Sequence, residues 1–146
     1  MEDKEFDEFI KKMKNSVFRY YNCNPKQKRT DDCVIRAISE ATGESWEKTL
    51  RDLTEYMVET GDMLNTPELY GKYLSDKGWV EQQQPMCANH KKMKIKDFVK
   101  QFNGRAVIHV GDTHVSYVSD GKLWDIWNCE NEVMGVYWIP KHEMKK

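Results

Sequence analysis

Apolar side chains recur every three or four positions through most of the first hundred residues, a spacing that predicts amphipathic helices. The first such stretch covers 2–21. We expect its apolar face to pack on the core, in preference to acting as a partner-binding arm. The residues on that face are Phe6, Phe9, Ile10, Met13 and Val17.

Capping and breaker residues divide the next segment into further helices. A polar loop covers 22–32. Its last residues, Thr30, Asp31 and Asp32, offer N-cap side chains to a helix at 33–42. Helix starts are signalled by Ser45 and by Thr66-Pro67, and stop signals follow each of them. The remaining predicted elements are helices at 45–60, 66–77 and 94–102 and a strand-like piece at 79–80.

From residue 105 the pattern changes to short β-branched and apolar runs, which indicate strands at 105–110, 114–118, 123–127 and 133–139. Asp120-Gly121 separates the second and third runs, and an Asp-Gly pair in this position predicts a two-residue hairpin. Helices that precede an antiparallel meander indicate the α+β class. We therefore expect a single domain over 1–146, with an N-terminal helix at 1–21, a helical part at 22–104 and an antiparallel sheet at 105–140.

Composition excludes several classes of protein. The chain carries 23 Lys and Arg against 24 Asp and Glu, and 39% of its 146 residues are hydrophobic. This balance disfavours both disorder and a dedicated nucleic-acid binder. The chain contains neither an apolar run of the roughly 18 residues that a membrane helix needs nor an N-terminal signal-peptide core. We expect a cytoplasmic protein of a bacterium, or of the host cell if a phage encodes it.

Cys33 and His114 are candidates for nucleophilic catalysis. Cys33 opens a predicted helix, where backbone N–H groups and the helix dipole favour an anionic thiolate. His114 begins a predicted strand directly after a turn, and imidazole is a natural base for a thiol. The alternatives are a small buried helical cysteine and a structural histidine whose nitrogens are satisfied.

The hairpin register selects the acid that would orient such a histidine. With a two-residue loop, Asp125 pairs with Ser116 and lies on the same face as His114. A bulge of one residue reverses this parity and favours Asn128. Asp125 is therefore our first candidate and Asn128 the reserve. Gln27, six residues before Cys33, is a candidate oxyanion donor beside the Cys33 backbone N–H; the alternative is a solvated loop glutamine.

Two segments of the chain resemble the papain-like cysteine peptidase superfamily. They are Q-K-R-T-D-D-C at 27–33 and H-V-S-Y-V-S-D-G-K-L-W-D-I-W at 114–127. The Asp-Cys pair is similar to one found in a family of bacterial cysteine peptidases. The run N-P-x-x-K-R-T-x-D-C-V-I-R-A-I-S and D-G-K-L-W-D-I-W look like small papain-like proteins of Firmicutes and their phages. The resemblance covers about 30 residues with the same chain order.

The resemblance implies a papain-like fold and a Cys33–His114–Asp125 triad that acts through a covalent acyl-enzyme on a peptide or protein substrate, without a cofactor. Gln27 would then stabilise the oxyanion. Trp127, with Trp124, would shield the histidine–acid contact from water, although core packing explains both equally well. The alternative from another class is a non-catalytic papain-fold binding or accessory protein.

A metal-dependent module is the third possibility. Cys87 and His90 have a spacing that can supply two zinc ligands, and Cys23 and Cys129 could complete a set of four. These residues are scattered and no C-x-x-C pair occurs, so we expect no metal site. The basic run at 91–96 is interpreted as a solvated face, and we expect neither nucleic acid nor a membrane among the partners.

Overall fold

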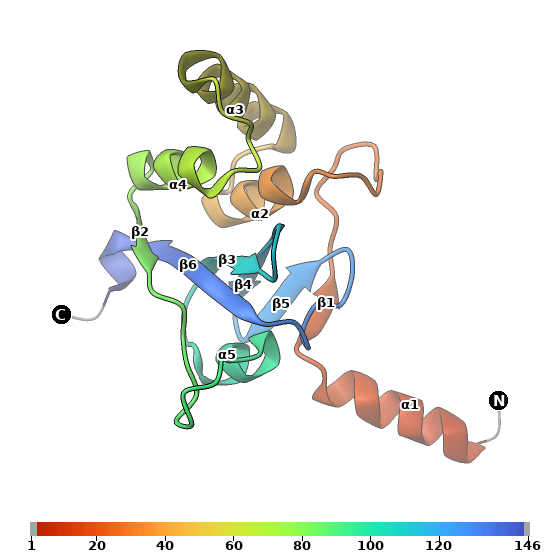
Figure 1. The fold of residues 1–146 in the computed structure, drawn as a ribbon. Coiled ribbons are helices and arrows are strands. Elements are labelled where there is room, and N and C mark those ends of the chain that lie inside the picture. Colours follow the sequence, from red (N-terminus) through yellow and green to blue (C-terminus); the bar gives the residue numbers. More distant parts are fainter. Residues whose placement is uncertain (1–2, 145–146) are drawn as a thin grey trace.

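The computed structural model describes residues 3–144, without the side chain of Met13. It has an α+β architecture in which a six-stranded sheet lies between two helical layers (Figure 1). The helices are α1 (Asp3–Asn15), α2 (Cys33–Thr42), α3 (Trp46–Thr60), α4 (Pro67–Asp76) and α5 (Ile95–Gln101), with a final 3-10 turn η1 (Lys141–Glu143). The strands are β1 (Phe18–Tyr20), β2 (Trp79–Gln82), β3 (Ala106–Val110), β4 (His114–Ser119), β5 (Lys122–Asp125) and β6 (Met134–Pro140).

The sheet separates two apolar clusters. One cluster joins α2, α3 and α4 to the sheet and includes Ile38, Leu53 and Trp138, all nearly inaccessible to solvent. The other joins α5 to the opposite face and includes Phe98 and Ile108. Figure 1 shows α2, α3 and α4 on one side of the strands and α5 on the other. Burial on both faces explains why the central strand β3 is almost continuously apolar.

The hairpin between β4 and β5 has the predicted two-residue loop. Ser119 pairs with Lys122 and Tyr117 with Trp124. Asp120 and Gly121 have φ values of 55° and 69°, the left-handed conformations that a type I′ turn requires. The register prediction is therefore confirmed, and it sets which residues of the two strands face one another.

The N-terminal prediction is wrong in part. The predicted helix at 2–21 ends at Asn15, and Phe18–Tyr20 instead forms β1, which pairs in parallel with β5. The sheet order is β1-β5-β4-β3-β6-β2, so the predicted antiparallel sheet is in fact mixed and extends beyond 105–140. Strand β1 supplies backbone hydrogen-bond partners to an edge of β5 that would otherwise be unpaired.

The packing predicted for the first helix is also wrong. Phe6 and Phe9 are 52% and 49% exposed, although Ile10 is half-buried and Val17, which precedes β1, is buried. Figure 1 shows α1 projecting from the sheet edge, because the chain turns into β1 directly after this helix. Within residues 3–144, no helix is long and apolar enough to cross a membrane.

The helices after the first loop begin where their capping residues predict. The Ser45 side chain accepts a hydrogen bond from Lys48 N at the start of α3, and Thr66 caps α4 with Pro67 in its first turn. Gly43, in the left-handed conformation, ends α2. Helix α2 therefore has the predicted length. It packs along β4 and carries Cys33 at its first position.

Candidate active site

Cys33 and His114 each occupy the first position of their element. Cys33 begins α2 and is half-buried, with its side chain against the apolar cluster above the sheet. His114 begins β4, against which α2 packs. The two side chains lie close enough for Cys33 to be among the groups that raise the pKa of His114. The structure therefore places together the two residues that the sequence proposed as a nucleophile and its base.

Asp125 holds the imidazole from the other side. Its Oδ2 lies 2.6 Å from Nε2 of His114, and the Asp125 side chain is 1% exposed. This contact follows from the hairpin register, because Tyr117 pairs with Trp124 and Asp125 is the next residue of β5. With Nε2 engaged by the carboxylate, Nδ1 is the imidazole nitrogen left for Cys33.

Three further donors hold the Asp125 carboxylate. Ser116 Oγ donates to Oδ2 at 2.6 Å, the backbone N–H of Ile126 donates to Oδ1 at 2.7 Å, and Arg36 Nη1 lies 2.9 Å from Oδ1. Burial by itself raises the pKa of Asp125, but the hydrogen bonds from His114, Ser116 and Ile126 outweigh burial and hold it below its usual value. Asp125 is therefore an oriented, ionised carboxylate.

Arg36 connects Asp125 to a second buried carboxylate. Its Nε lies 2.7 Å from Oδ1 of Asp32, and the Arg36 and Asp32 side chains are 5% and 4% exposed. The other Asp32 oxygen accepts hydrogen bonds from Trp46 Nε1 at 2.9 Å and Asn24 Nδ2 at 3.1 Å. A buried chain of charges thus runs from Asp32 through Arg36 and Asp125 to His114.

This chain of charges corrects the role predicted for Asp32. Asp32 is at the N-cap position of α2, as expected, but its side chain makes no capping hydrogen bond, because Arg36, Trp46 and Asn24 occupy the carboxylate. The first N–H groups of α2, beside Cys33, are therefore not covered by the side chain that normally satisfies them. Such N–H groups point at the place where an anion would form.

The protonation of His114 reflects two opposing effects. Burial lowers the pKa of His114, whereas its interactions with Asp125, Cys129 and Cys33 raise it, and the raising effects prevail. The net pKa is well above the usual value for histidine. His114 is therefore a cationic imidazolium at neutral pH, and Cys33 is one of its neighbours.

The remaining candidates from the sequence have separate positions. The ring of Trp127 lies 5.0 Å from that of His114, centroid to centroid, and is 39% exposed, so it covers one side of the imidazole. Trp124 instead donates its indole N–H to Ser119 O. Asn128 is exposed and bonds Glu130, so the structure joins the first candidate, Asp125, and not the reserve, to His114.

Gln27 does not face the candidate site as an open donor. Its φ is 55°, and its side-chain Nε2 donates to the backbone oxygens of Asn22 and Asn24 at 2.9 and 3.0 Å. Both amide hydrogens are thereby used to hold the 22–27 loop. In this conformation the helix N–H groups beside Cys33 are better placed than Gln27 to meet an oxyanion.

Cys129 is a neighbour of the site that the sequence placed only in a scattered zinc set. Its Sγ lies 3.8 Å from Asp125 Oδ2 and is buried. In the part of the chain that the structure describes, potential ligand atoms from three His, Cys, Asp or Glu residues gather within 4.8 Å at His114, Asp125 and Cys129. Cys87 and His90 are not in this group, and the Asp125 oxygens are already bonded to His114 and to other donors.

Arg36 and Ser116 are the site residues that the sequence argument did not assign. The Asp32–Arg36 spacing of four residues, together with an arginine inside the apolar run V-I-R-A-I, was a signal for a buried ion pair. Ser116 was named in the register argument as the partner of Asp125, but its bond to the carboxylate was not anticipated. Contacts between α2 and the hairpin are long-range, and one sequence does not reveal them.

Comparisons of this chain with protein-family models, with curated proteins and with solved structures found no match. The site combines three features: the half-buried Cys33 thiol beside the His114 imidazole, the buried Asp125 carboxylate that holds this imidazole, and uncapped N–H groups at the start of α2. Together these groups are able to carry out nucleophilic acyl transfer.

Proposed function

We propose that the protein is a papain-like cysteine hydrolase, most simply a peptidase, that acts through Cys33, His114 and Asp125. The observation that carries the proposal is the 2.6 Å contact from His114 Nε2 to a buried, multiply bonded Asp125, beside a cysteine at a helix N-terminus. The near-neutral charge of the chain fits action on soluble substrates, and we place the protein in the cytoplasm of a bacterium or of a phage's host.

The reaction divides among these groups in a defined order. The Cys33 thiolate attacks the carbonyl carbon of an amide or ester, and a bond from Sγ to that carbon forms. The N–H groups at the start of α2 donate hydrogen bonds to the oxyanion that forms. His114 gives its proton to the leaving nitrogen or oxygen as the scissile bond breaks, and water, deprotonated by His114, then releases the acyl group from Sγ.

Asp125 acts by orientation and charge. Its bond to Nε2 leaves Nδ1 available to exchange a proton with Cys33, and the carboxylate stabilises the imidazolium throughout the cycle. Ser116 and the Ile126 N–H hold the carboxylate itself, so that the imidazole has little freedom to rotate. Trp127 limits the access of water to this contact from its exposed side.

The test is the pH dependence of Cys33 alkylation by a limiting electrophile, with the modified residue assigned by peptide mapping. An unpaired thiol loses about tenfold in rate for each pH unit below its usual pKa of about 8.5. We expect the rate at Cys33 to stay nearly constant from pH 8 to pH 6. In H114A the tenfold loss for each pH unit should return.

Two internal references make this test decisive. The H90A variant removes an exposed histidine far along the chain and should leave the Cys33 rate unchanged. Cys87, also half-buried, reports how an ordinary thiol of the same protein behaves. If Cys33 reacts no faster than Cys87 at pH 6, and H114A reacts as the wild type does, the protein is not a cysteine hydrolase and the fold serves binding.

A further inference from the structure

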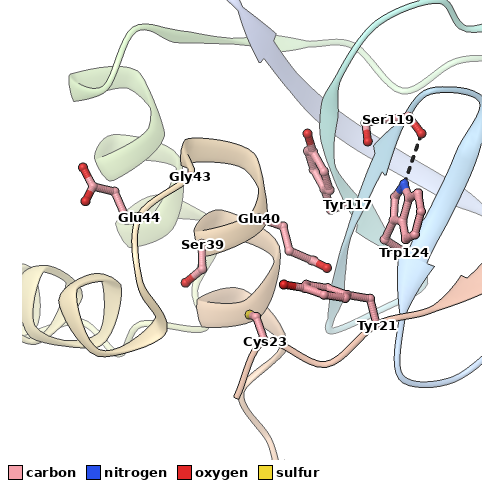
Figure 2. A pocket seen from close by; sticks show the side chains of 9 residues that line it. All are labelled: Tyr21, Cys23, Ser39, Glu40, Gly43, Glu44, Tyr117, Ser119 and Trp124. Carbon is pink, nitrogen blue, oxygen red and sulfur yellow. Dashed lines mark hydrogen bonds between the residues drawn. The ribbon is translucent and has the colours of Figure 1, made fainter. Parts of the chain in front are cut away.

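A cavity lies on the same helix as Cys33 but toward its other end. It has a volume of about 370 Å³ and is bounded by the C-terminal half of α2, the segment 21–23 and the β4–β5 hairpin (Figure 2). Glu40 is seven residues after Cys33, about 10 Å further along the helix axis. The cavity is therefore separate from the candidate active site, with the buried Arg36 between them.

Glu40 lines this cavity, and one oxygen of its carboxyl group lacks a hydrogen-bond partner. Among residues 3–144, its Oε1 is the buried side-chain oxygen or nitrogen that has no hydrogen-bond partner. Figure 2 shows its carboxyl extending from α2 toward the strands. The nearest cation on the helix, Arg36, is already engaged by Asp32 and Asp125. A buried oxygen without a partner is costly, which indicates a place for a ligand atom.

The walls of the cavity favour a cation. Three aromatic side chains line it, those of Tyr21, Tyr117 and Trp124, and aromatic faces attract organic cations. Glu40 and Glu44 contribute two carboxyl groups, and no lysine, arginine or histidine is among the described residues of the lining. Trp124 is held in place by its bond to the Ser119 carbonyl, drawn as a dashed line in Figure 2.

We propose that this cavity binds a primary alkylammonium group, with Glu40 as the counter-ion and the rings of Tyr21, Tyr117 and Trp124 around the charge. One unpartnered oxygen suits a compact ammonium better than a guanidinium, which calls for a two-pronged acceptor. The group has two chemical sources, a small free amine and a lysine side chain of a peptide. Neither source requires that Cys33 be a nucleophile.

Ligand binding at Glu40 is coupled to a proton. Burial, reinforced by the charge of Asp125 and opposed by that of Arg36, raises the pKa of Glu40 to about 9. Burial, reinforced by the charge of Glu40, also raises the pKa of the Cys23 thiol. Burial raises the pKa of the Tyr117 phenol as well, where Ser119 and the Arg105 cation oppose the shift and Glu40 adds to it. Glu40 is therefore protonated at pH 7 in the unliganded protein, and an ammonium that pairs with its carboxylate releases close to one proton.

The experiment is titration of the full chain with n-butylammonium and, separately, with Nα-acetyl-lysine methylamide. The amide signals of Tyr21, Glu40 and Tyr117 and the Trp124 indole signal are followed by ¹H–¹⁵N NMR. We expect these signals to shift together, with a Kd in the millimolar range that suits ligands of so few atoms. Calorimetry at pH 7 in two buffers of different ionisation enthalpy should detect release of the proton.

The controls distinguish charge pairing with Glu40 from nonspecific binding in an apolar cavity. The neutral isosteres 1-butanol and Nα-acetyl-2-aminoheptanoic acid methylamide should bind at least tenfold more weakly. E40Q, which keeps the shape, should weaken ammonium binding by about tenfold to a hundredfold. E47Q makes the same substitution at an exposed position of α3 and should leave binding unchanged.

Each outcome decides the proposal. Binding of butylammonium that depends on Glu40 supports a free amine as the source, and binding of the lysine derivative alone supports a peptide side chain. Equal binding of the neutral isosteres, equal loss in E40Q and E47Q, or no shift with either amine overturns it. The alkylation rate of Cys33 should be the same in E40Q as in the wild type, so a failure here is distinct from a failure of the proposed catalysis.

Discussion

Arg36 is the most consequential single side chain of the buried charge network, and R36M tests it directly. Methionine keeps much of the length of the arginine stem but removes the guanidinium. Two nearly inaccessible carboxylates, those of Asp32 and Asp125, then lose their shared cation. We expect this loss to lower the stability of the protein far more than the loss of a surface ion pair.

The magnitude follows from the burial of the partners. Breaking a buried ion pair by removing one member costs about 3–5 kcal/mol, a large fraction of the 5–15 kcal/mol that stabilises a typical domain. With a slope of about 2 kcal/mol per molar urea, the unfolding midpoint of R36M should fall by about 2 M. K48M is the matched control, because it breaks the exposed Lys48–Asp52 pair, which has the same spacing of four residues.

Urea unfolding followed by circular dichroism measures both variants. K48M should lower the free energy of unfolding by less than about 1 kcal/mol, as is usual for exposed pairs. If R36M and K48M lower the unfolding midpoint equally, the buried network stabilises the protein no more than an exposed ion pair does, and the reasoning is refuted. In a folded R36M protein, Cys33 alkylation at pH 6 should also slow, since Asp125 loses one of the groups that fix its position.

Three further predictions concern other parts of the fold. Because burial raises the pKa of Glu40 to about 9, the native state keeps a proton that the unfolded chain loses above its ordinary pKa near 4.5. The stability of the wild type relative to E40Q should therefore fall by about 1.4 kcal/mol per pH unit from pH 5.5 to 8, and a constant difference in thermal unfolding across this range would contradict the assignment. G135A should destabilise the protein by about 1–3 kcal/mol, because the added Cβ would lie 2.9 Å from Cδ2 of His109 and 3.0 Å from its backbone oxygen; a melting temperature equal to that of the wild type would mean that the strands yield. Y70F removes the hydroxyl that lies 2.9 Å from Nδ1 of His109 and should cost about 1–3 kcal/mol in urea unfolding; an unfolding midpoint equal to that of the wild type would contradict this expectation.

Local chemistry accounts for what the sequence predicted well. Ser45, Thr66 and Gly43 mark helix ends because caps and left-handed residues act within one turn. Asp120-Gly121 fixes the hairpin register for the same reason, and that register placed Asp125 beside His114. The α+β class, the helix opened by Cys33 and the choice of Asp125 over Asn128 were all accessible from the printed residues.

Non-local pairing accounts for the errors at the N-terminus. Apolar residues at helical spacing predict a helix, but the pattern does not show what covers its apolar face, and Phe6 and Phe9 remain about half exposed. Phe18–Tyr20 becomes a strand because the edge of β5, a hundred residues later, offers backbone partners. A three-residue strand has no periodicity to detect, and the energy of its pairing belongs to the sheet as a whole.

Tertiary structure alone decides which partners the charged groups within the core contact. Arg36 and Glu40 occupy one helix and look alike in sequence, as polar interruptions of an apolar run. Arg36 pairs with two carboxylates and becomes part of the candidate active site. Glu40 instead lines a cavity that also contains aromatic rings, and one of its oxygens has no partner. The sequence supplies the charges, but burial and the distance to an opposite charge set their energy, and both depend on how the helix lies against the hairpin.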